Sequence, residues 1–328
     1  MSSLVQVAIH PSQFPENVRR DLLESLRIRR VNHKFHYDSI RQTQQWLALH
    51  QAFSPSRTDP DCAAAYDRSF AAAAARMDSR RVHLIGLGCG GGQKDTRLLE
   101  LLRDSGRPVF YTPSDVSAAM VLVARQAAMA AVPGENCFPL ICDLASADDL
   151  PAALDALPVS AATRLITFFG MIPNFEPELI MPRLAALVRA GDCLLFSANL
   201  APGADYAAGV QRILPQYDNA LARDWLMTFL LDLGVAATDG ELRFIVEDSP
   251  ARSGLKRVAA YFHFSRPREV CVDAQSVAFA AGDSIRLFFS YRHTPALARE
   301  LLGQHGLGVL DQWITRSEEE GVFLAGRV

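Results

Sequence analysis

The chain has 328 residues, a net charge of −3 at neutral pH and a composition that is 49% hydrophobic. This length is enough for one large domain, or for one domain that carries a sizeable insertion. The small net charge and the lack of a long basic block argue against a nucleic-acid partner. The N-terminus has no signal-like pattern, and no apolar run is as long as a membrane span. We therefore expect a cytoplasmic protein without membrane contact, as a monomer or homodimer.

The six cysteines are scattered along the chain without a C-x-x-C pair. Several lie in apolar segments, where cysteine acts as a small hydrophobic residue. We therefore expect neither disulfides nor a metal site.

Residues 1–75 are predicted to be mostly helical, with a loop around 54–56. From residue 82, short apolar segments alternate regularly with helical ones. The predicted strands cover 82–87, 109–113, 137–142, 164–169 and 192–200, and the helices between them cover 96–103, 117–130, 147–156 and 177–188. This alternation predicts a parallel sheet with helices on both faces.

The pattern changes after residue 205. A long helical stretch, 206–233, is expected to break at Pro215. The strand-like runs that follow are 244–247, 258–265, 270–272 and 284–291, and the tail adds a helix at 294–306 and an antiparallel pair at 312–315 and 322–325. The sequence thus predicts an α/β, doubly wound core with a second subdomain.

The expected division places the core at 76–204 and its last strands at 286–328. The second subdomain would be built from the helical residues 1–75 and from an insertion at 205–285.

Five glycines follow or end the first predicted core strand. The segment 82–87 is continuously apolar, as a buried strand is, and it leads into Gly86, Gly88, Gly90, Gly91 and Gly92. A strand, a glycine turn and a helix form the usual cradle for a nucleotide-like cofactor. We predict that Gly86, Gly88, Gly90 and Lys94 contact this cofactor.

Two aspartates distinguish between possible cofactors. A dinucleotide favours G-x-G-x-x-G, whereas this loop is G-x-G-x-G-G-G. Asp115 follows the second strand, where a carboxylate accepts hydrogen bonds from ribose hydroxyls, and Asp143 follows the third, facing the adenine amino group. Either aspartate alone could instead cap the next helix. Together with the loop they favour S-adenosylmethionine.

Several blocks match one enzyme family in order and spacing. They are 34–38, 53–58, 87–90, 111–117, 168–177, 216–219 and 285–295. Over nearly its whole length the chain resembles the histidine-specific, S-adenosylmethionine-dependent Nα-methyltransferases of ergothioneine biosynthesis. The resemblance implies a class I methyltransferase fold, Rossmann-like and doubly wound, with an additional subdomain that forms the amino-acid pocket over the cofactor.

The resemblance also assigns three acceptor-binding residues. Tyr37, Asn174 and Tyr217 fall where the family holds the α-amino and carboxylate groups of its substrate. Phenol hydroxyls can donate to a carboxylate, and an amide carbonyl can accept from an amine. Taken alone, the tyrosines could be packing residues and Asn174 a turn residue.

The chain departs from the family where the imidazole is bound. The family uses a tyrosine, a glutamate and a serine, whereas this sequence has Phe53, Phe288 and Ser290. The match at Phe53 requires a one-residue gap. Two phenylalanines would leave imidazole nitrogens unpaired, at a cost of roughly 1–3 kcal/mol each. We therefore expect an acceptor other than histidine.

An aromatic pocket is compatible with more than one chemistry. The favoured one is N-methylation of an apolar or aromatic amino acid, or of a related amine. The alternative is cyclisation of S-adenosylmethionine itself to azetidine-2-carboxylate and methylthioadenosine, with the sulfonium held by cation–π attraction. The chain is similar in general appearance to bacterial azetidine-2-carboxylate synthases, and no motif separates the two groups. A catalytically silent sensor of S-adenosylmethionine is a third interpretation.

Overall fold

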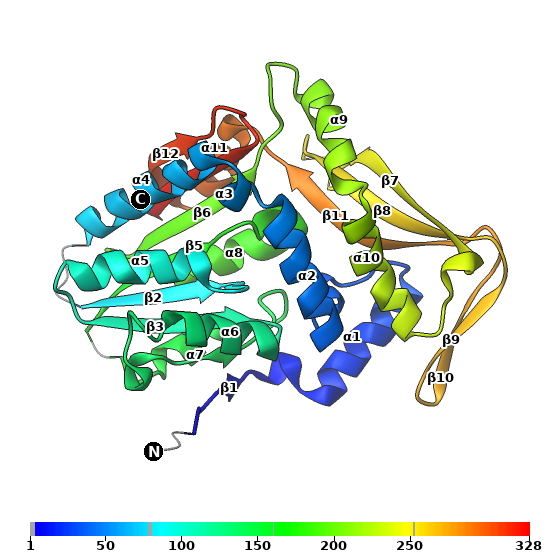
Figure 1. Ribbon diagram of the computed structural model, residues 1–328, viewed down its shortest axis with the longest axis horizontal. Coiled ribbons are helices and arrows are strands. Elements are labelled where there is room, and N and C mark those ends of the chain that lie inside the picture. The colour runs from blue at the N-terminus through cyan, green and yellow to red at the C-terminus, as the bar shows by residue number, and fades with distance from the viewer. Residues whose placement is uncertain (1–3, 78–80, 160, 252) are drawn as a thin grey trace. The chain divides into compact units, whose positions relative to one another are not determined.

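The computed structural model describes residues 4–77, 81–159, 161–251 and 253–328. The chain divides into two compact units, each assembled from separate stretches of sequence (Figure 1). Unit 1 comprises Met1–Gln13, Pro55–Leu200 and Thr294–Val328, and unit 2 comprises Phe14–Ser54 and Ala201–His293.

Unit 1 is built on an eight-stranded mixed sheet with the order β1-β4-β3-β2-β5-β6-β13-β12. Neighbouring strands from β1 to β6 pair in parallel, and β13 pairs antiparallel with both β6 and β12. The strands are β1 (Ala8–Ile9), β2 (Val82–Leu87), β3 (Val109–Asp115), β4 (Leu140–Ile141), β5 (Thr163–Phe168), β6 (Cys193–Asn199), β12 (Leu307–Ile314) and β13 (Glu320–Arg327).

Both faces of this sheet are covered by helices. Side chains of β2 alternate between two hydrophobic clusters, with Leu84 in one and Ile85 in the other. Helices α4 (Pro60–Arg76), α5 (Gln93–Asp104) and α6 (Ala118–Ala128) contribute to the first, and α7 (Leu150–Asp155), α8 (Pro177–Leu187) and α11 (Pro295–Gly303) contribute to the second. This is the doubly wound α/β arrangement that the sequence predicts.

Unit 2 combines helices with antiparallel strands. Its main sheet has the order β11-β8-β7, and β9 and β10 form a separate hairpin. The strands are β7 (Gly240–Asp248), β8 (Lys256–Phe264), β9 (Arg268–Val272), β10 (Gln275–Phe279) and β11 (Ser284–Arg292), and the helices are α1 (Pro15–Arg27), α2 (Ile40–Phe53), α9 (Tyr206–Tyr217) and α10 (Ala220–Asp232). Its core is rich in aromatic residues, among them Trp225, Phe229 and Phe262.

Several boundaries differ from the expected ones. Pro215 lies inside α9, and the helix pair separates at Asn219, whose side chain caps α10 by accepting from the N–H of Ala222. The expected loop at 54–56 overlaps a short helix, α3 (Pro55–Thr58). The two-residue strand β1 and the strand β10 were not expected. Both are short, so they lack the periodicity on which a strand prediction depends.

The units also divide differently from the predicted domains. Residues 55–75 belong to unit 1, because α4 packs its alanine-rich face on the core sheet. Strand β11 belongs to unit 2, because it pairs with β8. Over the described ranges, no helix is long and apolar enough to cross a membrane, and no group of three or more histidine, cysteine, aspartate or glutamate residues is arranged to hold a metal ion.

Candidate functional site

The glycine loop joins β2 to α5 and is held by an aspartate from the neighbouring strand. Gly88 and Gly90 both adopt positive φ angles, of 62° and 51°, which glycine tolerates best. The N–H of Gly90 donates to Oδ2 of Asp115 over 3.0 Å, and the N–H of Ser117 donates to Oδ1 over 3.0 Å. Burial raises the pKa of Asp115, and these hydrogen bonds oppose the shift.

Neither predicted aspartate is the cap of the following helix. Ser117 caps α6, and Asp149 occupies the N-cap position of α7. Asp115 instead closes the glycine loop, and its carboxylate has enough acceptor sites for further donors such as a ribose diol.

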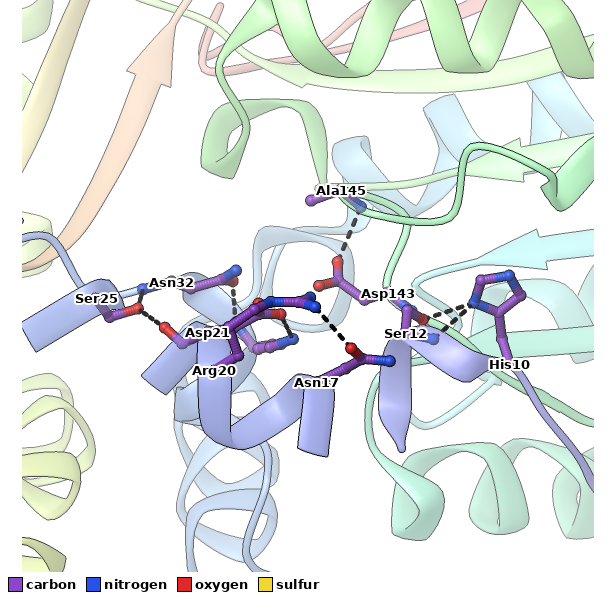
Figure 2. Close-up of polar contacts among 10 residues, drawn as sticks. His10, Ser12, Asn17, Arg20, Asp21, Ser25, Asn32, Asp143 and Ala145 are labelled. Carbon is purple, nitrogen blue, oxygen red and sulfur yellow. Dashed lines mark hydrogen bonds and ion pairs between the residues drawn. The ribbon is translucent and has the colours of Figure 1, made fainter. Parts of the chain in front are cut away.

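Asp143 lies after β4 and is fixed by the N-terminal segment of the chain (Figure 2). Its N–H donates to Oγ of Ser12 over 3.0 Å, and Oδ1 accepts from the N–H of Ala145 over 2.9 Å. Nδ1 of His10 accepts from the N–H of Ser12 and lies 2.8 Å from its Oγ, while Nε2 lies 2.7 Å from Oδ1 of Asp149. With Nδ1 accepting from Ser12, Nε2 is the ring nitrogen that faces the carboxylate of Asp149.

Lys94 lies in the first turn of α5, directly after the glycine loop. Its Nζ donates to Oη of Tyr66 over 2.8 Å and lies 4.0 Å from the centre of the same ring. Oη of Tyr66 in turn donates to the carboxylate of Glu320 on β13. Burial lowers the pKa of Lys94, and the charge of Glu320 opposes that shift.

The next residue, Asp95, was not identified from the sequence. Its buried carboxylate accepts from Tyr111 on β3 over 2.9 Å and from Thr167 on β5 over 2.8 Å. Burial raises its pKa to about 6. A Cβ on Gly86 would lie 2.0 Å from Oδ2 of Asp95, so β2 requires glycine there. A glycine inside a buried strand was the available signal for this close approach.

Asn174, the predicted acceptor residue of unit 1, ends a short 3₁₀ helix after β5. Its side chain is half-buried, and its N–H donates to the carbonyl of Met171. Within unit 1, the structure therefore places Asn174 after β5, the glycine loop after β2, Asp115 at the end of β3 and Asp143 after β4. Ligands of parallel α/β sheets bind at this carboxyl edge.

Three predicted residues of unit 2 lie together around one phenol. Oη of Tyr217 is 2.7 Å from Oγ of Ser290 and accepts from Arg292 over 2.8 Å. The ring of Phe288 lies 5.9 Å from that of Tyr217 and 6.0 Å from Trp225. Arg292 was not identified from the sequence, because a basic residue at the end of a strand carries no distinctive pattern.

The other two predicted residues of unit 2 differ in environment. The Tyr37 ring contacts Trp46, at 5.9 Å, and Trp225, at 5.6 Å, and Trp225 also contacts Phe288. Phe53 ends α2, and 52% of its surface is exposed. Phe53 is therefore much more exposed to solvent than Phe288, which is 9% exposed.

Comparisons with known proteins identify the family. A family model described as "Histidine-specific methyltransferase, SAM-dependent" matches residues 18–327. A search of curated proteins finds no match.

Solved structures of methyltransferases are similar at low sequence identity. Magnesium protoporphyrin IX methyltransferase from Synechocystis PCC 6803, with bound SAH, shares 14% identity over 89% of this chain and 97% of its own, with a TM-score of 0.48. The 1,6-didemethyltoxoflavin-N1-methyltransferase from Burkholderia thailandensis shares 12% identity over 87% of each chain, with a TM-score of 0.43.

The match of the family model confirms the predicted cofactor, S-adenosylmethionine, as a methyl donor. It extends from α1 to β13 and so includes both units. The chain belongs to the histidine-specific, S-adenosylmethionine-dependent methyltransferase family and is an enzyme with the class I, Rossmann-like α/β fold of such methyltransferases.

Proposed function

We propose that the enzyme methylates the amine nitrogen of an apolar or aromatic amino acid, or of a related amine, rather than histidine. The observation that carries this proposal is the position of Phe288. The resemblance places a glutamate there in the family, whereas here a phenylalanine packs against Trp225 and Tyr217. An imidazole against this wall would leave nitrogens unpaired, at roughly 1–3 kcal/mol each, whereas an apolar side chain would not.

On the basis of the family resemblance, we assign the binding of the acceptor's α-amino and carboxylate groups to Tyr37, Asn174 and Tyr217. The guanidinium of Arg292 donates to the phenol oxygen of Tyr217, and Ser290 lies within hydrogen-bond distance of the same atom. Arg292 thus holds the phenol oxygen of Tyr217 in place, and the phenol hydrogen can be donated either to Ser290 or to a carboxylate of the acceptor.

The chemistry requires little beyond positioning. S-adenosylmethionine supplies an electrophilic methyl group on its sulfonium. The protein's residues have to hold a neutral amine nitrogen in line with that group and keep its lone pair free. Orientation accounts for most of the rate gain in such reactions, so a strong general base is not required.

Cyclisation of S-adenosylmethionine to azetidine-2-carboxylate is the second candidate. The supporting observation is the run of aromatic rings from Trp46 through Tyr37, Trp225 and Phe288 to Tyr217. Aromatic faces attract cations, and a sulfonium is a cation. The contacts around Tyr217 favour methyl transfer, because a cyclase has no second substrate to hold.

The acceptor preference can be tested by calorimetric titration of L-phenylalanine and L-histidine onto the protein saturated with S-adenosylhomocysteine. We expect the unmodified protein to bind phenylalanine at least tenfold more tightly, which corresponds to about 1.4 kcal/mol. Phe288→Glu should reverse this order by supplying an acceptor for the imidazole N–H. Phe288→Leu is the matched control and should keep the preference for the apolar ligand. Equal or tighter binding of histidine by the unmodified protein would contradict the proposal.

A further inference from the structure

Lys94 is connected to Glu320 on β13 through the hydroxyl of Tyr66. We call this buried chain of two hydrogen bonds, Lys94–Tyr66–Glu320, the relay. Tyr66 is 1% exposed and Glu320 is 8% exposed. The hydroxyl of Tyr66 donates to Glu320, so the phenol hydrogen is committed and a lone pair is left for a donor. That donor is the ammonium of Lys94, 2.8 Å away. The carboxylate of Glu320 thus sets the orientation of the hydroxyl that receives Lys94.

The relay also fixes the direction of the lysine. Nζ lies over the Tyr66 ring, 4.0 Å from its centre, and the Tyr66 ring is packed edge-on against Phe169, which follows β5. Lys94 is therefore held at the carboxyl edge of the sheet, next to the glycine loop, by a hydrogen bond and a cation–π contact. A free lysine side chain would sample many rotamers.

The ammonium has capacity for a ligand. It carries three hydrogens, and among the residues that the structure describes it donates one hydrogen bond, to Tyr66. S-adenosylmethionine carries one anionic group, the carboxylate of its amino-acid arm. An ammonium that is partly removed from water pairs strongly with such a carboxylate.

We propose that Tyr66 and Glu320 position the ammonium of Lys94 so that it binds the carboxylate of S-adenosylmethionine. This inference rests on Lys94 belonging to the cofactor site and is independent of the acceptor. A purely structural role is the competing explanation, in which the relay ties α4, α5 and β13 together without affecting ligand binding.

The test compares two ligands that differ in the arm concerned. S-adenosylhomocysteine carries the carboxylate, whereas 5′-methylthioadenosine has the same nucleoside and no amino-acid arm. Affinities for both are measured by calorimetry on Tyr66→Phe, Glu320→Gln, Glu320→Ala and Lys94→Met. The matched control is Tyr261→Phe, which removes a comparable tyrosine–glutamate hydrogen bond, to Glu247 in unit 2. A thermal melt of each variant shows whether it is folded.

We expect Tyr66→Phe to weaken S-adenosylhomocysteine binding about tenfold and to leave methylthioadenosine binding unchanged. Lys94→Met should weaken it at least as much, and Glu320→Ala more than Glu320→Gln, which keeps an acceptor for the tyrosine. Tyr261→Phe should change neither affinity. An equal loss for both ligands in Tyr66→Phe, or no loss for S-adenosylhomocysteine, would overturn the proposal. Acceptor preference plays no part in these titrations, so they succeed or fail separately from the proposed function.

Discussion

At the scale of single residues, Asp95 shows how one buried carboxylate fixes the cofactor loop. It lies in the first turn of α5 and accepts hydrogen bonds from Tyr111 and Thr167, on the two strands that flank β2. The loop between β2 and α5 is therefore held at its helical end by Asp95 and in its middle by the contact of Asp115 with Gly90. Gly86 is the position on β2 that leaves space for Asp95.

Gly86→Ala tests this packing. The new Cβ would lie 2.0 Å from Oδ2 of Asp95, so the carboxylate would have to leave its hydrogen bonds or the helix would have to shift. We expect a loss of about 1–3 kcal/mol in the free energy of unfolding, measured by urea denaturation. Gly303→Ala is the matched control, because a Cβ there meets nothing within 4 Å and should be tolerated. Equal stability of the two variants would show that the site relaxes without cost.

The sequence allowed some of these residues to be proposed and not others. Asp115 and Asp143 were found because each follows a predicted strand of a recognisable alternation. Tyr66, Asp95 and Glu320 were not, because their contacts join elements that are far apart in the chain. A pattern within one segment carries no information about which side chains of other segments it meets.

At the scale of elements, two histidine side chains lie within hydrogen-bond distance of backbone carbonyl groups on the outer edge of β11. The carbonyl of Leu287 lies 2.6 Å from Nε2 of His36, and that of Phe289 lies 3.3 Å from Nε2 of His33. Both histidines belong to the 3₁₀ helix His33–His36, so one short segment covers an edge that would otherwise expose unpaired backbone groups. Burial lowers the pKa of His36 to about 4 and that of His33 to about 3.

These lowered pKa values predict that the folded protein loses stability in acid. A histidine whose folded pKa lies below its unfolded value of 6.5 takes up a proton more readily when unfolded, so stability falls as the pH drops from 6.5 towards 4. For His36 the loss between pH 7 and pH 5 should be about 2 kcal/mol. Asp95 has a raised pKa and acts in the opposite direction over part of this range.

The contribution of His36 is isolated by comparing the protein with His36→Gln, whose amide can still donate to the carbonyl of Leu287. Urea unfolding is measured at pH 7 and pH 5 for both, and Asp95 cancels in the difference. We expect the unmodified protein to lose about 2 kcal/mol more than the variant over this interval. An identical pH dependence would mean that His36 titrates normally in the folded protein.

At the scale of the whole molecule, the sequence predicted the type of fold of each part better than it predicted the boundaries between the parts. The strand–helix alternation from residue 82 predicted the doubly wound core, and its antiparallel end strands, because long periodic segments determine their own structure. The boundary at 55–75 depended on which sheet α4 covers, and the assignment of β11 depended on its pairing with β8. Both depend on tertiary contacts, which the local periodicity of the sequence does not determine.

The same distinction applies to the site. The cofactor was predictable because a glycine loop and two spaced aspartates lie within about sixty residues. The proposed class of acceptor was inferred only by elimination, from Phe288, and stays a prediction. The residues around Phe288 and Tyr217 include Trp225 and Arg292. They come from three separate elements, so only the structure shows that they lie together.

The most direct test of the central claim is product analysis by mass spectrometry. The purified enzyme is incubated with S-adenosylmethionine alone and, in parallel, with S-adenosylmethionine and each proteinogenic amino acid. We predict S-adenosylhomocysteine and an N-methylated product only in the presence of an apolar or aromatic amino acid, with histidine a poor acceptor. Methylthioadenosine and azetidine-2-carboxylate from S-adenosylmethionine alone, or methylated histidine as the main product, would contradict the account.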